Sequence, residues 1–409
     1  MRIGEFAKKH GVTQDAIRHY LDMGLLVAEK SGGQYRFNEA DSKDLDSIID
    51  LKKLDFTLNE IQKILSIQRL SGTNTDVYRN QYLTFLEEKK KEIENEISRY
   101  DKVSLYLKDK IHKIKNEELN DRQNLGFPLT SLHILECPIC HLTIDLSDGI
   151  IEKNMIIEAN IQCECGYKGI VRNGIYIDET CVRTKMLNGN KMPSKEEYLD
   201  SSSHRYINFL YKGIASLIEY IKKYGQEPKY IIELDNCVGF FLLQYIETLP
   251  KDTVYILIDY DLNRITQLKK NLELYYNHNN FIFLCCDYHR LPIKKQSIDV
   301  AVDFWMTKTY AMGTGKLLVD KVFPLMKYNG LYTAAYPYFE RDTKDNIKVS
   351  EEMKDYLNKN IILDKFKKSG ISIMDTIDIG PVIEDNPFNI DTKGASIYQG
   401  ILVGKKTSG

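Results

Sequence analysis

Two close pairs of cysteines are the residues of this chain whose type and spacing most favour chemistry. Cys137-Pro-Ile-Cys140 and, 22 residues further on, Cys163-Glu-Cys165 suit a tetrahedral site of four thiolates. The first pair forms a knuckle whose turning backbone amides can hydrogen-bond the sulfur atoms, and the second pair is one residue tighter than usual. Because four thiolates leave no open position, we expect structural zinc. A redox or metal sensor is the alternative, and His141 could replace one thiolate.

The composition is that of a globular chain in a reducing compartment. Hydrophobic residues make up 43% and charged residues 28%, as in ordinary folded domains. Eight cysteines, four of them in close pairs, indicate metal binding rather than disulfides and therefore a cytoplasmic location. Every apolar stretch is soon interrupted by charge and no signal peptide is evident, so we expect no membrane partner. A length of 409 residues predicts two to four domains.

Three acidic residues fall where strands of a parallel sheet should end. Strand and helix patterns alternate over residues 195–409, which predicts an α/β sheet with helices on both faces. Ligands of such sheets bind beyond the carboxyl ends of the strands, where we place Glu233, Asp259 and Asp287. The expected strands are Tyr230–Leu234, Val254–Asp259, Phe281–Cys285, Asp299–Asp303, Leu331–Tyr336, Ile371–Ile379 and Ile397–Val403.

This region resembles the class I S-adenosylmethionine (SAM)-dependent methyltransferases. The residues that carry the resemblance are Ile-Ile-Glu233-Leu-Asp-Asn-Cys-Val-Gly239, Tyr-Ile-Leu-Ile-Asp259-Tyr-Asp261 and Cys-Asp287-Tyr-His-Arg-Leu-Pro292. A preceding zinc ribbon is similar to that of the ribosomal-RNA guanine methyltransferases. The resemblance implies that Asp259 accepts from ribose hydroxyls, that Asp287 accepts from the adenine amino group, and that Glu233 and the following backbone hold the methionine end. It also places Tyr288 among the cofactor-binding residues.

The glycine loop departs from the family pattern. Where the family has Gly-x-Gly-x-Gly, this chain has Asp235-Asn-Cys237-Val-Gly239, so side chains replace two glycines that let backbone approach the ligand. In place of an Asn-Pro-Pro-Tyr element for amine methylation the chain has Asp303-Phe-Trp305. We therefore name no catalytic residue. The domain could bind SAM weakly, bind another ligand, or bind none.

Caps and glycine turns organise the first 60 residues. Thr13 is expected to cap a second short helix that Gly24 ends, and Gly32-Gly33 permits the tight hairpin of a β-wing over residues 26–37. Two further caps are expected to open later helices: Asn38, before a helix from Glu39 to about Leu54, and the capping box Thr57–Glu60. This order of elements predicts a winged helix-turn-helix.

The second short helix presents its polar face to solvent. Helix periodicity directs Gln14, Asp15 and Arg18 outward, whereas Ile17 and Leu21 face inward. Residues 1–70 contain 11 Lys and Arg against 11 Asp and Glu, so bulk charge cannot supply affinity for nucleic acid. Any DNA contact must come from locally placed residues.

These 70 residues resemble the MerR family of bacterial transcription regulators. The matching segments are Ile-Gly-Glu-Phe-Ala at 3–7, Ile-Arg-His-Tyr at 17–20, Gly-Leu-Leu at 24–26, Gln-Tyr-Arg-Phe at 34–37 and Asp-Phe-Thr-Leu-Asn-Glu-Ile at 55–61. The resemblance implies phosphate contacts from Arg18 and Tyr20, base-edge positions for Gln14 and Asp15, and backbone contacts from the wing. The implied DNA-binding set is Thr13, Gln14, Asp15, Arg18, His19, Tyr20, Tyr35 and Arg36. His19 stands where the family commonly has a second Tyr. The alternative is a helix-turn-helix used only for protein contact.

A heptad pattern follows the head. One seam position holds Leu86, Ile93, Tyr100, Leu107 and Ile114, and the other holds Leu83, Ile97 and Ile111, with Lys90 and Ser104 as interruptions. This seam predicts a partner helix, most simply that of a second subunit, and the family resemblance implies antiparallel packing. The alternative is a long helix packed on its own chain.

The expected fold is multidomain: an all-α winged helix-turn-helix with a long coiled-coil helix, a small β zinc ribbon, and an α/β Rossmann-like methyltransferase sheet. The expected boundaries are 1–72 for the DNA-binding head, 73–118 for the dimer helix, 119–131 for a linker, 132–180 for the zinc ribbon and 195–409 for the sheet.

These features favour a dimeric transcription regulator whose methyltransferase-like domain is a receptor for SAM or another small-molecule effector. The expected partners are promoter duplex, a second copy of the chain and, indirectly, RNA polymerase. One alternative is an active methyltransferase, acting on RNA or a small molecule, that controls its own gene. Another is a catalytically inactive scaffold.

Overall fold

The computed structural model describes residues 1–116, 124–179, 195–234, 239–339, 354–384 and 395–407. The chain divides into two compact units, Met1–Glu118 and Leu119–Gly409. Asp235 and Cys237, which the sequence assigned to cofactor binding, lie outside the described residues.

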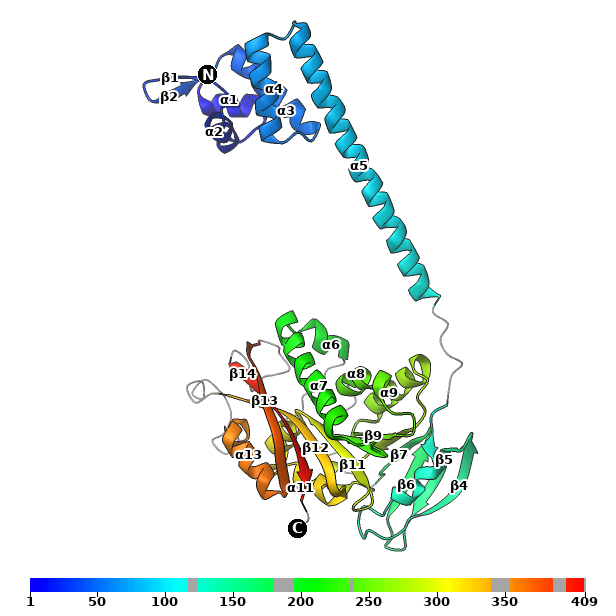
Figure 1. Ribbon diagram of the computed structural model, residues 1–409. Helices are drawn as coiled ribbons and strands as arrows, with labels where there is room; N and C mark the ends of the chain where they lie inside the picture. Colours follow the sequence, from blue (N-terminus) through cyan, green and yellow to red (C-terminus); the bar gives the residue numbers. More distant parts are fainter. Residues whose placement is uncertain (117–123, 180–194, 235–238, 340–353, 385–394, 408–409) are drawn as a thin grey trace. The chain divides into compact units, whose positions relative to one another are not determined.

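The first unit is a small helical head followed by one long helix (Figure 1). Its core gathers apolar side chains from every head helix, among them Phe6, Ile17, Leu45 and Ile61, all of which are buried. The elements are α1 (Ile3–His10), α2 (Gln14–Asp22), β1 (Glu29–Ser31), β2 (Gln34–Arg36), α3 (Glu39–Lys53), α4 (Leu58–Ser71) and α5 (Asp76–Lys115).

The caps expected from the sequence form these elements. The Thr13 hydroxyl oxygen accepts a hydrogen bond from the Ala16 amide at the start of α2, and Gly24 has a positive φ of 71° just after that helix. Thr57 and Glu60 make the reciprocal bonds of a capping box at the start of α4. Gly32 and Gly33, both with positive φ, join β1 and β2 as a hairpin. The winged helix-turn-helix expected for this region is present.

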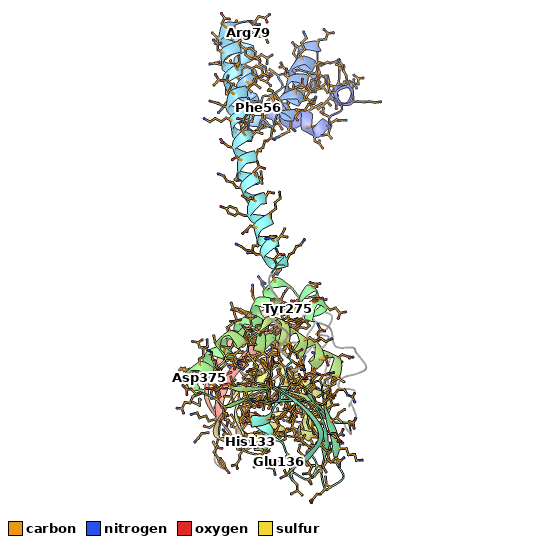
Figure 2. All side chains as sticks on the ribbon, turned by 90° about the vertical axis from the view of Figure 1, so that its right-hand side faces the viewer. Phe56, Arg79, His133, Glu136, Tyr275 and Asp375 are labelled. Atoms are coloured by element: carbon orange, nitrogen blue, oxygen red, sulfur yellow. The ribbon has the colours of Figure 1, made fainter. Side chains whose placement is uncertain are left out.

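Helix α5 has 40 residues, a length of about 60 Å. Tyr82, Phe85 and Leu86 pack against the head core. The buried Lys89 amine lies 5.3 Å from the ring centre of Phe56, a residue that Figure 2 labels beside α5. Leu86, which the heptad assigned to a partner seam, therefore contacts its own head instead. Beyond Lys89 the described part of α5 leaves large apolar side chains exposed: Ile97, Tyr100, Val103, Leu105, Tyr106, Leu107, Ile111 and Ile114.

The second unit is built on one large sheet, which has twelve strands within the described residues. The strands β10-β9-β8-β11-β12 are neighbours in this order and all parallel. Beyond β12, β14 pairs antiparallel with β12, and β13 pairs antiparallel with β14. These strands, all expected from the sequence, are β8 (Tyr230–Glu233), β9 (Val254–Asp259), β10 (Phe281–Cys285), β11 (Ile298–Phe304), β12 (Met326–Tyr338), β13 (Ile371–Ile383) and β14 (Ser396–Lys406).

Helices cover both faces of this sheet (Figure 1). Side chains alternate along β9, so that Ile256 enters the core on one face and Tyr255 and Leu257 enter the core on the other. The first face carries α10 (Met306–Thr314), α11 (Val319–Val322) and α13 (Lys359–Lys368). The second carries α7 (His204–Tyr224), α8 (Phe240–Tyr245) and α9 (Leu262–Tyr275). The unit is thus the doubly wound α/β arrangement that the sequence predicted.

The strands that follow the cysteine turns differ from the prediction, because they continue the main sheet rather than form a separate ribbon. Strand β7 (Ile175–Ile177) pairs in parallel with β10. Outside it lie β6 (Lys168–Arg172), β5 (Met155–Gln162), β4 (Asp145–Glu152) and β3 (Phe127–Pro128). The expected linker over 119–131 also holds β3 and the start of the 3-10 turn Leu129–Ile134. The physical reason is a shared core, in which Cys137 and Tyr176 pack with Leu284.

The remaining described elements are the short helix α6 (Lys195–Asp200) and the 3-10 turns η2 (Ile246–Thr248), η3 (Tyr288–Arg290), η4 (Phe323–Leu325) and η6 (Asp355–Leu357). Across the described ranges, no helix is long and apolar enough to cross a membrane.

Candidate functional site

The head exposes most of the residues expected to touch DNA. Gln14, Arg18 and His19 are exposed on α2, and Arg36 is exposed on the wing. The Arg18 guanidinium lies 2.6 Å from the Asp15 carboxylate, and both side chains are largely in solvent. Such exposed pairs contribute little to stability, so Arg18 is available for another anion.

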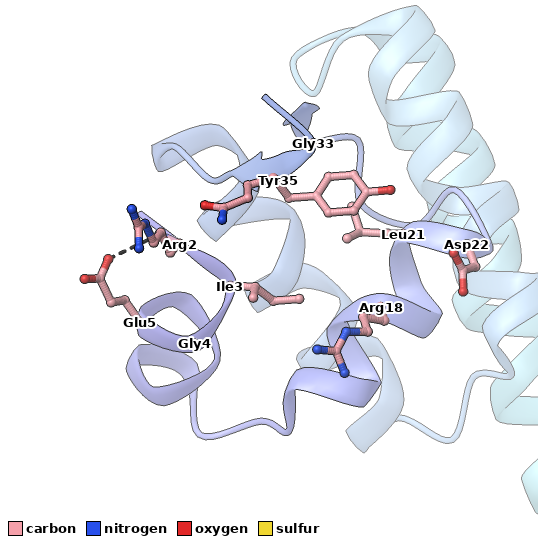
Figure 3. Close-up of a pocket in the computed structure, with 10 residues that line it drawn as sticks. Arg2, Ile3, Gly4, Glu5, Arg18, Leu21, Asp22, Gly33 and Tyr35 are labelled. Atoms are coloured by element: carbon pink, nitrogen blue, oxygen red, sulfur yellow. Dashed lines mark hydrogen bonds between the residues drawn. The ribbon is translucent and has the colours of Figure 1, made fainter. Parts of the chain in front are cut away.

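Arg18 and Tyr35 line the same hollow between α2 and the wing (Figure 3). Figure 3 also shows Arg2 and Ile3, from the start of α1, at this hollow. Arg2 was not among the residues expected to bind DNA. The sequence signal for Arg2 was its place directly before α1. The backbone amides of a first helical turn attract anions, and a neighbouring cation adds to that attraction. The lining residues are Arg2, Ile3, Gly4, Glu5, Arg18, Leu21, Asp22, Gly33, Gln34 and Tyr35.

Two residues of the expected DNA-binding set also have structural contacts within the head. Tyr20 is only 5% exposed and belongs to the head core, with its hydroxyl oxygen 3.5 Å from the Lys52 amine. The Thr13 hydroxyl serves as the cap of α2. Helix periodicity turns the Tyr20 ring inward with Ile17. The phosphate contact expected of Tyr20 stays a prediction.

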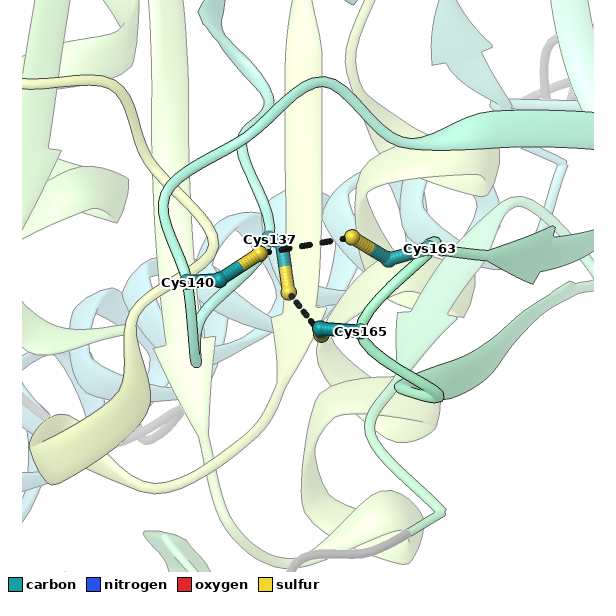
Figure 4. A group of neighbouring side chains, drawn as sticks. All are labelled: Cys137, Cys140, Cys163 and Cys165. Atoms are coloured by element: carbon teal, nitrogen blue, oxygen red, sulfur yellow. Dashed lines mark hydrogen bonds between the residues drawn. The ribbon is translucent and has the colours of Figure 1, made fainter.

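The four predicted metal ligands come together (Figure 4). Their sulfur atoms lie within 4.8 Å of one another, with Cys137 Sγ 3.5 Å from Cys165 Sγ and Cys140 Sγ 3.4 Å from Cys163 Sγ. Zn–S bonds of 2.3 Å in a tetrahedron require sulfur separations of about 3.8 Å. All four are free cysteines, so the cluster fits a metal such as zinc.

Backbone groups around the first cysteine pair favour thiolate. The Leu142 amide hydrogen-bonds Cys140 Sγ, which lowers the pKa of that thiol to about 7. The turn is closed by the His141 amide, which donates to the Cys137 carbonyl at 3.0 Å, and by the Cys137 amide, which donates to the Leu142 carbonyl at 2.8 Å. The candidate metal-binding cluster of the described residues contains the four cysteines and not His141. The candidate ligand set is therefore four thiolates, without replacement of one by His141.

The three acidic residues lie at the carboxyl ends of adjacent strands. Glu233 ends β8, Asp259 ends β9, and Asp287 follows β10 by two residues. Strand order reverses between β8 and β11, because the chain builds β9 and β10 on one side of β8 before crossing to the other. Ligands of doubly wound sheets bind at such a switch point. The tertiary structure therefore places the predicted site residues at one sheet edge.

Glu233 is buried and holds a proton unusually well. The Tyr255 hydroxyl donates to its carboxylate at 2.7 Å. Burial outweighs this bond and raises the pKa of Glu233 to about 7. The Glu233 side chain therefore lies in the protein interior, where its hydrogen-bond partner is the Tyr255 hydroxyl.

Asp259 is fully buried and already engaged. Its Oδ1 accepts from the Asp261 amide at 2.8 Å, and Arg264 Nε lies 3.7 Å from its Oδ2. Arg264 was not anticipated, although an Arg near this acidic position is a known variation in dinucleotide sites. A ribose at this carboxylate would share it with Arg264.

Asp287 belongs to a chain of polar contacts. His289 Nδ1 lies 2.8 Å from Asp287 Oδ1, and His289 Nε2 lies 3.0 Å from the Tyr310 hydroxyl. Tyr288, predicted to bind cofactor, donates its hydroxyl to the Leu234 carbonyl at 2.9 Å. This bond ties the segment after β10 to the end of β8. His289 was missed, although it stands only two residues after Asp287.

The residues after β11 are used internally. The buried Asp303 carboxylate accepts from the amides of Met306 and Thr307 and from the hydroxyls of Thr307 and Tyr332. Trp305 has a φ of 63°, a conformation that bulky residues rarely adopt, and its indole N–H donates to Gln399 Oε1 at 3.2 Å. Asp303 therefore holds the start of α10 and the Tyr332 hydroxyl together.

Comparison with known proteins identifies the head. Residues 1–67 match the family described as "MerR HTH family regulatory protein". The head is a MerR-family domain. The chain is 35% identical over 81 residues to the HTH-type transcriptional regulator YfmP of Bacillus subtilis (strain 168), covering 19% of this chain and 58% of that protein. It is 41% identical over 68 residues to the mercuric resistance operon regulatory protein of Bacillus cereus, covering 16% of this chain and 52% of that protein. The chain thus spans about half the length of these relatives.

Solved methyltransferase structures are similar to part of the second unit. A putative methyltransferase of Bacillus halodurans C-125 covers 48% of this chain, with 99% of its own chain matched, at 9% identity and a TM-score of 0.37. The assignment of the second unit to the doubly wound class rests on its own strand order and helix placement.

Proposed function

We propose that this protein is a MerR-type transcription regulator that binds promoter DNA as a homodimer. We further propose that its methyltransferase-like unit is a receptor for SAM or a related small molecule. The observation that carries the proposal is the MerR-family head, with Arg18 and Arg36 exposed on the two elements that such a head presents to duplex. RNA polymerase is an indirect partner through the promoter.

Dimer formation is supported by the unpartnered face of α5. Tyr100, Leu107, Ile111 and Ile114 follow heptad spacing and are all more than half exposed in the single chain. Contiguous apolar surface of this kind marks an interaction site. A second α5 offers the same surface, and a twofold operator matches a twofold protein.

The receptor role is supported by the acidic residues at the carboxyl ends of the central strands. Acidic residues end β8 and β9 and follow β10 beside the switch point, where such sheets bind ligands. Asp303, in the position where an amine methyltransferase element would stand, is occupied by four internal donors. This arrangement favours ligand binding over methyl transfer.

Calorimetry of the purified protein with S-adenosylhomocysteine (SAH), with and without a fragment from upstream of its own gene, tests this function. We expect SAH to bind and its affinity to change with DNA, since a ligand regulates only by binding two states of the protein differently. Absence of SAH binding would remove SAM as the effector. Methyl transfer from labelled SAM to RNA or a small molecule would favour an active methyltransferase instead.

A further inference from the structure

The four-thiolate cluster and the Asp287 loop are connected through the backbone. We propose that the metal bound by Cys137, Cys140, Cys163 and Cys165 positions the segment 286–294, so that metal occupancy controls ligand affinity at the sheet edge. The effect on ligand affinity rests on the receptor function proposed above. The effect on the segment itself does not.

The first connection runs from Cys137 to the end of the segment. The Glu136 amide, one residue before Cys137, donates to the Pro292 carbonyl at 3.2 Å, and the Lys294 amide donates to the Ile134 carbonyl at 2.7 Å. Leu135 and Ile293 form an antiparallel bridge between these two bonds. The segment that enters the metal cluster therefore holds the backbone of residues 292–294, while the Ile293 side chain packs in the core of the sheet.

The second connection runs from Cys163 to the start of the segment. The Cys163 amide donates to the Tyr167 carbonyl at 3.0 Å, and the buried Tyr167 hydroxyl contacts the Tyr176 hydroxyl. Tyr176 lies in β7, opposite Leu284 of β10. The Asp178 amide then donates to the Cys285 carbonyl at 3.1 Å. Each cysteine pair thus reaches one end of the same segment.

The segment between these anchors carries the groups that face the ligand edge. Asp287 caps the turn Tyr288–Arg290 by accepting from the His289 amide at 2.9 Å. The Cys286 amide donates to the Asp259 carbonyl at 3.2 Å. A displacement of this segment would therefore move Asp287 and disturb Asp259 at the end of β9, which are two of the three acidic residues.

The metal is the dominant interaction in this arrangement. A tetrahedral thiolate site contributes far more to local folding than the few backbone bonds that join residues 134–136 to 292–294. Without the metal, four sulfur groups within 4.8 Å of one another have no common partner. The two cysteine turns then lose the bond that holds them together, and both anchors of the segment are released.

Hydrogen exchange of the full-length protein tests the first half of the proposal. The Lys294 amide is the reporter, and Ile401 in β14 at the opposite side of the sheet is the internal control. After chelation with confirmed metal release, we expect Lys294 to exchange at least about tenfold faster, the equivalent of one net hydrogen bond, with Ile401 unchanged. An unchanged Lys294 amide overturns the proposal. Equal acceleration at Ile401 also overturns it, because the metal would then hold the whole unit.

Glu136→Pro tests the backbone connection between the cluster and the segment 286–294 while the metal stays bound. Leu135 is already extended, with a ψ of 134°, which is the backbone conformation that a residue before proline adopts. The variant removes the N–H that donates to Pro292 and leaves all four thiolates. We expect full metal content, faster exchange at Lys294 and weaker SAH binding. Full metal content with a protected Lys294 amide would refute the connection.

SAH affinity with and without metal tests the second half. We expect metal removal to weaken SAH binding at least about tenfold, and SAH to tighten metal binding at equilibrium by the same factor, because coupling between two sites is reciprocal. Equal SAH affinity in both forms overturns control of the ligand site. If SAH binds neither form, the receptor function with this ligand fails, while Lys294 exchange still decides whether the metal positions the segment.

Discussion

The ion pair between Asp15 and Arg18 on α2 predicts opposite effects of two substitutions on DNA binding. Arg18→Ala removes a cation from the exposed face of α2, and Asp15→Asn removes the carboxylate that lies 2.6 Å from it. Both side chains are largely exposed, so the pair contributes at most about 1 kcal/mol to stability and either variant should fold. The two variants therefore report on DNA contact rather than on the fold of the head.

The magnitudes follow from counterion release. Each phosphate contact contributes about 0.9 to the slope of log affinity against log salt, so Arg18→Ala should lower the slope by about one for each subunit. Asp15→Asn should tighten binding up to about fivefold, the equivalent of an exposed pair of up to about 1 kcal/mol. In an Arg18→Ala background that gain should shrink, since only the repulsion between Asp15 and DNA is then removed.

Fluorescence anisotropy over a salt series measures both effects, with a mixed-sequence duplex and with the upstream fragment. Asp109→Asn and Lys113→Ala form the matched control, because this pair has similar exposure and spacing on α5 but lies outside the head. An unchanged slope in Arg18→Ala would contradict a phosphate contact. Weaker binding by Asp15→Asn would show that Asp15 reads a base instead.

Three further predictions concern the helix, its attachment and the sheet edge. Ile111→Glu should convert a dimer to a monomer, as measured by light scattering, because burial of each such apolar side chain contributes about 1.5–3 kcal/mol. Lys110→Glu is the neighbouring control. A dimeric Ile111→Glu protein would place the interface elsewhere. Lys89→Met should lower the free energy of unfolding of the head, measured in urea, by about 1–2 kcal/mol, since Glu60 and Glu92 lose their buried partner but stay partly exposed. An unchanged free energy of unfolding would show that this contact is dispensable. Because folding raises the pKa of Glu233 to about 7 from 4.5, the folded state keeps a proton that the unfolded chain releases, and stability should fall as pH rises between these values. Glu233→Gln should remove up to about 3 kcal/mol of that fall, and parallel curves for the two proteins would refute it.

Local patterns determined much of this protein before any tertiary contact was considered. Thr13, Asn38 and Thr57 each cap the helix expected, since a cap needs only a side chain and the next three amides. The same is true of the central strands, whose apolar runs are buried on both faces. The cysteine cluster also followed from spacing, because Cys137 and Cys140 fit one turn.

Only the tertiary structure decided how these parts are joined. The sequence separated the cysteine strands from the sheet, but pairing of β7 with β10 depends on backbone bonds between residues about 100 positions apart, which no local pattern encodes. The burial of the Tyr20 ring in the head core likewise depends on packing among the head helices. Asp259 carried the expected charge, but its approach to Arg264 and its burial are set by the surrounding fold. Residue type and spacing thus determined which groups are present, and long-range packing decided which of them remain free to act.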